Sequence, residues 1–220
     1  MAVAPRYVTH MKKLHLLRHP LAQHHLAALR ATATPPDEFR RLVRRLTLLL
    51  AAEATRDLAT KPVRVTTPLM TAPGAQLCEH IGLVPILRAG LGMVDALLEL
   101  LPQAAVWHLG VYRDERTLLP VEYYAKFKRA RPVDVALVLD PMLATGGSAL
   151  AALELLSQWG VKRIKLLALI AAPEGVKKVQ QAFPRVEVHL VALDRRLNQH
   201  GYILPGLGDA GDRTFNARAR

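Results

Sequence analysis

The sequence predicts an α/β fold in which helices flank a mostly parallel sheet. Short, continuous apolar runs, such as residues 81–87 and 135–139, alternate with segments of helical periodicity, which is typical of a parallel sheet buried on both faces. The chain has 220 residues, of which 51% are hydrophobic and 22% charged. These values suit one domain with a substantial core and exclude a disordered or collagen-like chain. Because ligands of such sheets bind at the carboxyl ends of the strands, the loops there are the candidate site.

Residues 1–10 are expected to form a loose extension, and residues 11–220 a single domain. A short helix is predicted over residues 21–30. Thr34 as a capping residue, two prolines and two acidic residues then predict the start of a second helix. One face of that helix is apolar and should be buried: Phe39, Leu42, Val43, Leu46, Leu49 and Leu50. Prolines and threonines over residues 60–76 indicate a small β-arm.

The rest of the chain alternates between the two kinds of element. Strands are predicted at residues 81–87, 104–111, 121–124, 135–139, 164–171 and 186–192. Helices are predicted at residues 91–101, 148–159 and 174–183. Four glycines and a proline over residues 201–213 argue against a helix or an ordinary strand, so we expect a loop there, anchored by apolar side chains such as Ile203.

The formal net charge of +12 indicates attraction to anions: nucleic acid, an anionic membrane or a phosphorylated small molecule. Four arginines of the second helix share one stripe, which we interpret as a solvated face: Arg40, Arg41, Arg44 and Arg45. Nucleic acid is an unfavoured partner, because no aromatic stacking pattern accompanies the charge. No apolar run approaches the ~20 residues of a membrane span. We therefore expect a cytoplasmic protein with no membrane partner.

The strongest chemical signal follows the predicted strand at residues 135–139. That strand ends in Asp140, whose carboxylate can accept hydrogen bonds from a pair of ribose hydroxyls. A short loop then opens a helix with glycines and hydroxyl side chains, which lets backbone N–H groups and the helix N-terminus hold a phosphate. No lysine follows the glycines, which excludes a Walker loop. The expected binding segment is Asp140, Pro141, Met142, Leu143, Ala144, Thr145, Gly146, Gly147 and Ser148.

Three other features bear on chemistry. Arg88 lies between a predicted strand and a glycine-containing turn, where a guanidinium fork and backbone donors suit a pyrophosphate. Arg113 lies in a charged segment, residues 112–117, that either closes over an anionic substrate or forms an exposed hairpin. The glycine-rich residues 201–213 expose main-chain groups that can read a planar base. The nine histidines show no ligand spacing, so no protein metal site is expected.

Together these segments resemble the uracil phosphoribosyltransferases, a family of type I phosphoribosyltransferases. The resemblance rests on residues 19–21, 85–92, 112–115, 140–148 and 202–212, which occur in the family's order. It implies a type I phosphoribosyltransferase-like sheet with a small β-arm and a hood loop over residues 194–216. It also implies transfer of the phosphoribosyl group of 5-phosphoribosyl 1-diphosphate (PRPP) to N1 of uracil, giving UMP and diphosphate in pyrimidine salvage.

The resemblance further assigns roles to residues. Residues 140–148 would hold the ribose and its 5′-phosphate, while Arg88 and Arg113 would face the diphosphate. The main chain of three residues would read uracil: Ile203, Gly208 and Ala210. Asp209 would lie beside the Mg²⁺–diphosphate and belong to both the PRPP and the uracil set. Asp209 and Arg113 are therefore the candidate catalytic residues.

Mg²⁺ is the implied cofactor, held mainly by diphosphate and water because the ribose motif has one acidic residue. A homodimer or higher homo-oligomer and a GTP effector are also implied. Residues 125–131 look shorter and more basic than the family's loop at that place. The alternatives are a transferase for another base, an RNA-binding regulator on the same fold, and an inactive homologue.

Overall fold

The computed structural model describes residues 13–113, 120–125 and 131–217. The expected extension at residues 1–10 and most of residues 125–131 lie outside the described residues. The central sheet has the strand order β1-β11-β10-β8-β4-β6-β7, in which every neighbouring pair is parallel except β6 and β7. Its strands are β1 (Leu14–Leu16), β4 (Ile81–Leu87), β6 (Leu109–Arg113), β7 (Pro120–Ala125), β8 (Val135–Leu139), β10 (Arg163–Ala171) and β11 (Glu187–Leu193). Two short strands pair at its sides, β5 (Ala105–Val106) with β4 and β9 (Met142–Leu143) with β10.

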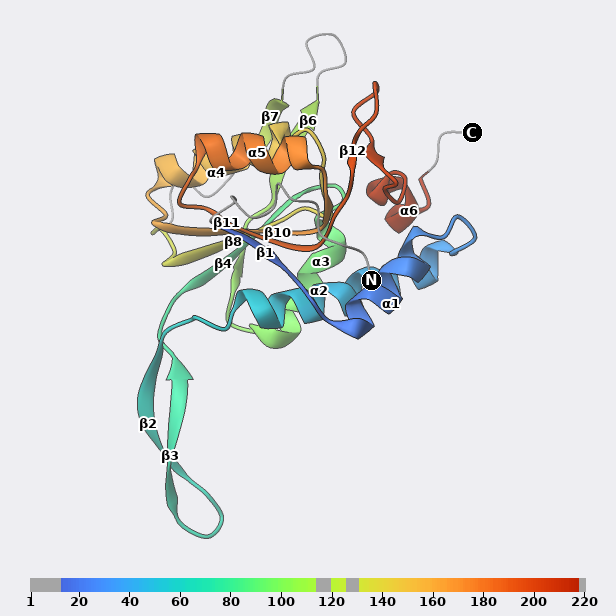
Figure 1. Cartoon of the computed structure of the whole chain (residues 1–220). Helices are drawn as coiled ribbons and strands as arrows, with labels where there is room; N and C mark the ends of the chain where they lie inside the picture. The colour runs from blue at the N-terminus through green and yellow to red at the C-terminus, as the bar shows by residue number, and fades with distance from the viewer. Residues whose placement is uncertain (1–12, 114–119, 126–130, 218–220) are drawn as a thin grey trace.

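Helices cover both faces of this sheet (Figure 1). One face carries α1 (Pro20–Arg30), α2 (Pro36–Ala54) and α3 (Leu91–Leu100), and the other carries α4 (Gly147–Trp159) and α5 (Pro173–Ala182). The predicted α/β class with a mostly parallel sheet is therefore confirmed. None of the helices in the described parts of the chain combines the length and the apolar character needed to cross a bilayer.

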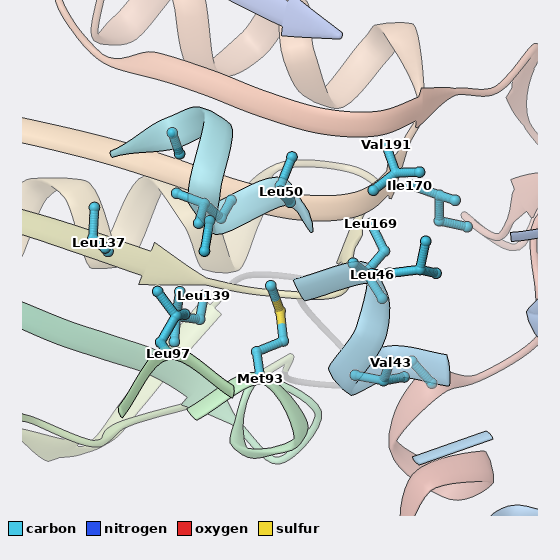
Figure 2. Close-up of a cluster of buried hydrophobic side chains, with 14 of the residues drawn as sticks. Val43, Leu46, Leu50, Met93, Leu97, Leu137, Leu139, Leu169, Ile170 and Val191 are labelled. Carbon is cyan, nitrogen blue, oxygen red and sulfur yellow. The ribbon is translucent and has the colours of Figure 1, made fainter. Parts of the chain in front are cut away.

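A hydrophobic core lies on each face of the sheet. All five residues of β8 are buried, as are the first six of β4, which accounts for their uninterrupted apolar sequence. On the α1–α3 face, side chains of α2 such as Leu46 and Leu50 meet Met93 and Leu97 of α3 over the strands (Figure 2). The arginine stripe of α2 points the other way: all four arginines are exposed, which confirms the solvated face.

The predicted β-arm is an antiparallel pair, β2 (Thr60–Thr66) and β3 (Thr71–Leu77), and it projects away from the body (Figure 1). Its turn carries two exposed apolar side chains, with Leu69 95% and Met70 69% accessible. A two-stranded ribbon buries little surface by itself, so the arm adds little to the core.

Three local predictions are corrected. The strand expected at residues 104–111 is interrupted after Val106, although both halves keep one register against β4. Arg113, expected in a loop, is the last residue of β6, because the backbone pairs on to Pro120 of β7. The side chain of Thr34 does not cap α2; its hydroxyl donates instead to the carbonyl of Ala28 at 2.5 Å.

The hood, residues 194–216, also differs from the expected loop. It contains the short antiparallel pair β12 (Arg196–Leu197) and β13 (Ile203–Leu204), and then the helix α6 (Ala210–Phe215). Asp209 is the N-cap of α6, since its carboxylate accepts from the N–H of Asp212 at 2.8 Å. A six-residue helix that begins directly after a glycine-rich run gives too short a periodic pattern to be recognised in sequence.

Candidate active site

Loops from neighbouring strands meet at the carboxyl edge of the sheet. The β4 loop (residues 88–90) follows β4, and the β8 loop (residues 140–146) follows β8, which pairs with β4 through Pro85 and Leu139. On the other side of β4 lies β6, which ends at Arg113. Parallel strands bring their carboxyl ends to one edge, so the sheet itself gathers the predicted site residues.

The β8 loop has the form expected of a phosphate site. Asp140 follows the buried strand, and its Oδ1 accepts from the N–H of Met142 at 3.1 Å. Gly146 precedes α4 with φ +79°, a conformation that favours glycine. The N-cap of α4 is Gly146, which has no side chain, so no hydroxyl or carboxylate of the N-cap residue competes with a ligand for the positive end of the helix.

The β4 and β8 loops are in close contact through Gly90. A Cβ atom on Gly90 would lie 2.4 Å from the carbonyl oxygen of Leu139 and 2.7 Å from the backbone of Ile86. Only a residue without a side chain fits there. This contact fixes the backbone that carries Arg88 directly against the strand end that carries Asp140.

The ionisation of Asp140 reflects its place in the site. Loss of surrounding water, followed by the nearby Asp209 carboxylate, raises the pKa of Asp140 to about 6, although the amide of Met142 favours its charged form. The Asp209 carboxylate is therefore near enough to act on Asp140, which places the start of α6 beside the β8 loop.

The hood also reaches the β4 loop directly. Nη2 of Arg88 lies 3.0 Å from Oδ1 of Asp212 on α6, and both side chains keep part of their surface in water. A cavity of about 540 Å³ opens beside the hood; it is lined by Gly206, Gly208, Asp209 and Asp212 among others. Of the described pockets, a larger one of about 580 Å³ lies at the opposite, amino-terminal edge of the sheet, near Lys162 and Arg185.

The structure thus brings together Arg88, the β8 loop and Asp209. Ile203 and Ala210 are buried in the hood, and Gly208 is exposed between them. The backbone of Arg113 ends β6 at the same edge, while the connection that follows it, residues 114–119, lies outside the described residues. Arg113 is thus in a strand rather than in a loop, and closure of the charged segment over a substrate stays a prediction.

Sequence reasoning missed the side chains that hold the hood. Arg30 of α1 forms a fork with Asp194, which directly follows β11, and Arg213 of α6 reaches carbonyls at the end of α1. The partners are 164 to 184 residues apart in the chain. No local spacing could have indicated them.

The structure also brings together one group of histidines that the sequence pattern did not indicate. His15 of β1 stacks on His189 of β11 with ring centroids 4.5 Å apart, and Glu187 completes a group that could hold a metal ion. The residues are paired across parallel strands, which a sequence pattern does not reveal. The buried ammonium of Lys165 lies 3.4 Å from the Glu187 carboxylate, and its positive charge opposes a cation there.

Comparison with known proteins agrees with this arrangement. The uracil phosphoribosyltransferase family model matches residues 16–217. A uracil phosphoribosyltransferase of Roseiflexus castenholzii is 57% identical over 205 residues, covering 93% of this chain and 99% of that protein. One from Symbiobacterium thermophilum is 54% identical over 209 residues, covering 94% and 100%.

A solved structure has a similar fold over nearly the whole chain. The AQ2163 protein from Aquifex aeolicus superimposes with a TM-score of 0.88 at 36% sequence identity, covering 94% of this chain and all of that one. The chain belongs to the uracil phosphoribosyltransferase family.

Proposed function

We propose that this chain transfers the 5-phosphoribosyl group of PRPP to N1 of uracil, giving UMP and diphosphate for pyrimidine salvage. The observation that carries the proposal is the meeting of the β4 loop, the β8 loop and the hood at one edge of the sheet, in a chain of this family. A phosphate-binding turn, an arginine and a glycine-rich backbone segment are the parts that such a transfer needs.

In this proposal the β8 loop holds the sugar. The Asp140 carboxylate accepts from the ribose hydroxyls, and the amides and hydroxyls of residues 144–148 surround the 5′-phosphate at the start of α4. Arg88 and Arg113 face the diphosphate and stabilise its charge as it leaves. The ribose becomes oxocarbenium-like as the bond from C1′ to diphosphate loosens, and N1 of uracil attacks the opposite face.

The hood reads the base in this proposal. Main-chain groups of Ile203, Gly208 and Ala210 match the O2, N3–H and O4 edge of uracil. Cytosine inverts two of these contacts, and a buried donor or acceptor left without a partner costs far more than a lost methylene. Selection of uracil therefore needs no side chain that touches the ring.

Mg²⁺ is the proposed cofactor, held mainly by the diphosphate and water, because the β8 loop supplies one acidic residue. The Asp209 carboxylate acts on Asp140 and so adds negative charge at the site, which suits a cation bound beside it. When bound with the diphosphate, the ion would neutralise charge on the leaving group.

We further propose that no side chain acts as a strong general base. Asp209→Asn keeps an oxygen to cap α6, so the fold is preserved. Turnover within about tenfold of the parent, with the same pH profile, is the expected result. A loss of several orders of magnitude that follows a single pKa would show that Asp209 removes the N1 proton.

A radiolabelled-uracil assay with PRPP and Mg²⁺ tests the function, run beside cytosine, hypoxanthine and orotate. UMP is expected as the only product; transfer to another base would assign the chain to a different substrate, and no transfer would indicate an inactive homologue. A homodimer or higher oligomer, a cytoplasmic location and a GTP effector are proposals that rest on the family. The exposed Leu69 and Met70 of the arm support the first, which sedimentation at increasing concentration tests.

A further inference from the structure

The segment proposed to read uracil has few main-chain bonds of its own to the sheet. This segment, residues 203–210, is called the cradle below. Among the strands in the described parts of the chain, its strand β13 pairs with the two-residue β12 alone. When a base is bound by main-chain N–H and C=O groups, side chains of the same segment do not make the contacts. Selectivity for the base then depends on the position at which the backbone is held. Whatever fixes the cradle therefore bears on base recognition.

Two side chains hold both polar groups of Gly206, in the middle of the cradle. Nη1 of Arg30 donates to the Gly206 carbonyl at 2.7 Å, and the Gly206 N–H donates to Oδ2 of Asp194 at 3.0 Å. Arg30 and Asp194 also bind each other as a fork, at 2.8 and 2.5 Å. Paired donors and acceptors in fixed planes leave the Gly206 peptide little freedom to turn.

This pair is itself fixed to rigid parts of the molecule. Asp194 directly follows β11, its N–H donates to the carbonyl of Ala171 at 2.8 Å, and its side chain is only 5% exposed. Arg30 is the last residue of α1. The sheet and α1 are thus connected to the cradle through one buried ion pair, which we call the Arg30–Asp194 clamp.

A second arginine extends the same attachment. Nη1 of Arg213 donates to the carbonyls of Leu207 at 2.7 Å and Leu29 at 2.8 Å, and its Nη2 donates to Ala31 at 2.6 Å. Its guanidinium lies 4.4 Å above the ring of Phe39. The end of α1 therefore holds two consecutive cradle residues, Gly206 and Leu207, through these arginines.

We propose that Arg30 and Asp194 are positioning residues for base recognition: they set the cradle's main-chain groups against uracil without contacting PRPP. This inference rests on the proposed function. Loosening the clamp should weaken binding of the base and leave the sugar diphosphate almost unaffected, because the β4 and β8 loops are built on the sheet and on Gly90.

Arg30→Lys tests the clamp in the full-length protein. Lysine keeps the charge opposite Asp194 but cannot reach both of its oxygens and the Gly206 carbonyl together. The KM for uracil is expected to rise about 10- to 100-fold, the size of effect that a displacement near 1 Å produces. The KM and calorimetric Kd for PRPP should change less than about threefold.

Arg163→Lys is the matched control. Arg163 pairs with Glu79 at 3.1 Å and is similarly accessible, at 31% against 22% for Arg30, but it begins β10 at the far edge of the sheet. It should lower thermal stability without separating the two KM values. Asp194→Asn, which retains an acceptor for the Gly206 N–H, is the second clamp variant. If Arg30→Lys does not fold, the same comparison of the KM values for uracil and PRPP is made with Asp194→Asn.

Equal changes in the KM values for uracil and PRPP, or no change in either, would overturn the proposed role of the clamp in base recognition. Calorimetric titration with UMP separates this outcome from a failure of the proposed function. If the parent protein binds UMP but forms none, the reaction is wrong, and the clamp is judged by whether Arg30→Lys weakens UMP at least tenfold while inorganic diphosphate binds as before. If the parent does not bind UMP, both proposals fail.

Discussion

The two sides of the site are held in place by different means. The β4 and β8 loops are extensions of buried strands, and they are fixed by backbone packing at Gly90. The hood has only short elements and is fixed by arginine and aspartate side chains that reach it from α1 and from the end of β11. A backbone contact tolerates no substitution, whereas a side-chain attachment can be weakened in steps. We call the β4 and β8 loops the phosphate side and the hood the base side, after the roles proposed above. Substitutions should abolish the activity of the phosphate side in one step and weaken that of the base side by degrees.

Gly90→Ala should break the phosphate side and have the largest effect. The new Cβ would meet the Leu139 carbonyl at 2.4 Å, so the β4 loop must move away from β8. We expect kcat/KM to fall by more than about 100-fold for both substrates, and stability by about 3 kcal/mol or more. Gly74→Ala in the arm is the control, because the atoms nearest to its Cβ would be side-chain methyls of Val65 and Val63, at 3.1 and 3.5 Å, and the backbone carbonyl oxygen of Val63 is 4.0 Å away. Equal, small effects of the two changes would contradict this account.

Asp140→Asn should separate activity from stability on the phosphate side. Loss of a charged acceptor for the ribose hydroxyls should lower kcat/KM by about 10- to 100-fold. Because burial and Asp209 raise the folded-state pKa of Asp140 to about 6, above its usual 3.8, the stability that its neutral form gives is complete below pH 4 and is lost as the pH rises through 6.

The asparagine form should therefore be more stable than the parent at pH 8, by about 1 to 3 kcal/mol, and show no gain at pH 4. Urea unfolding at both pH values measures the difference. Asp95→Asn on the exposed surface of α3 serves as the control and should change neither quantity. An equal gain at both pH values would mean that folding does not raise the pKa of Asp140.

Arg213→Lys should weaken the base side in a graded way. A lysine cannot serve three carbonyls and the Phe39 ring together, so buried carbonyls lose their donors. We expect stability to fall by about 2 to 3 kcal/mol and the KM for uracil to rise about tenfold, while the KM for PRPP stays within about threefold. A matching rise in both KM values would remove the distinction between the two sides.

Asp212→Asn probes the contact between the two sides and should have the smallest effect. Its ion pair with Arg88 is partly exposed, with side chains 33% and 58% accessible, and such pairs contribute about 0 to 1 kcal/mol. The carboxylate also competes with diphosphate for the arginine. Apparent affinity for PRPP should rise by less than about threefold, with thermal stability nearly unchanged. A loss of affinity would mean that Asp212 orients Arg88 rather than competing for it.

The difference between the two sides also explains what could be predicted from sequence. The buried strands at residues 81–87 and 135–139 are continuous apolar runs, and the strand at residues 164–171 is apolar except for Lys165. The β8 loop directly follows one of these runs, so the sheet and the β8 loop could both be predicted from the sequence. The hood was predicted as a loop from its glycines, its proline and the family resemblance, and these signals revealed neither α6 nor the contacts of Arg30 and Asp194. Contacts between residues more than 160 positions apart leave no trace in local pattern.

Two features of the sheet, β1 and the interruption after Val106, were not predicted from the sequence for a related reason. β1 has only three residues and is formed by pairing with β11, so its own sequence carries no strand signal. The interruption after Val106 occurs next to Trp107, whose ring fills the space above Gly82. Large side chains and short pairings are settled by tertiary packing rather than by propensity.

The attachment of the hood to α1 also fixes an order of events during synthesis. The end of α1 leaves the ribosome early. The guanidinium that donates to its carbonyls at Leu29 and Ala31 belongs to Arg213, which is translated more than 180 residues later. A nascent chain can therefore complete its sheet, from β1 to β11, before the side chain that joins α6 to α1 has been made. Termination between β11 and α6 removes Arg213, and with it this attachment, although all the strands of the sheet are present.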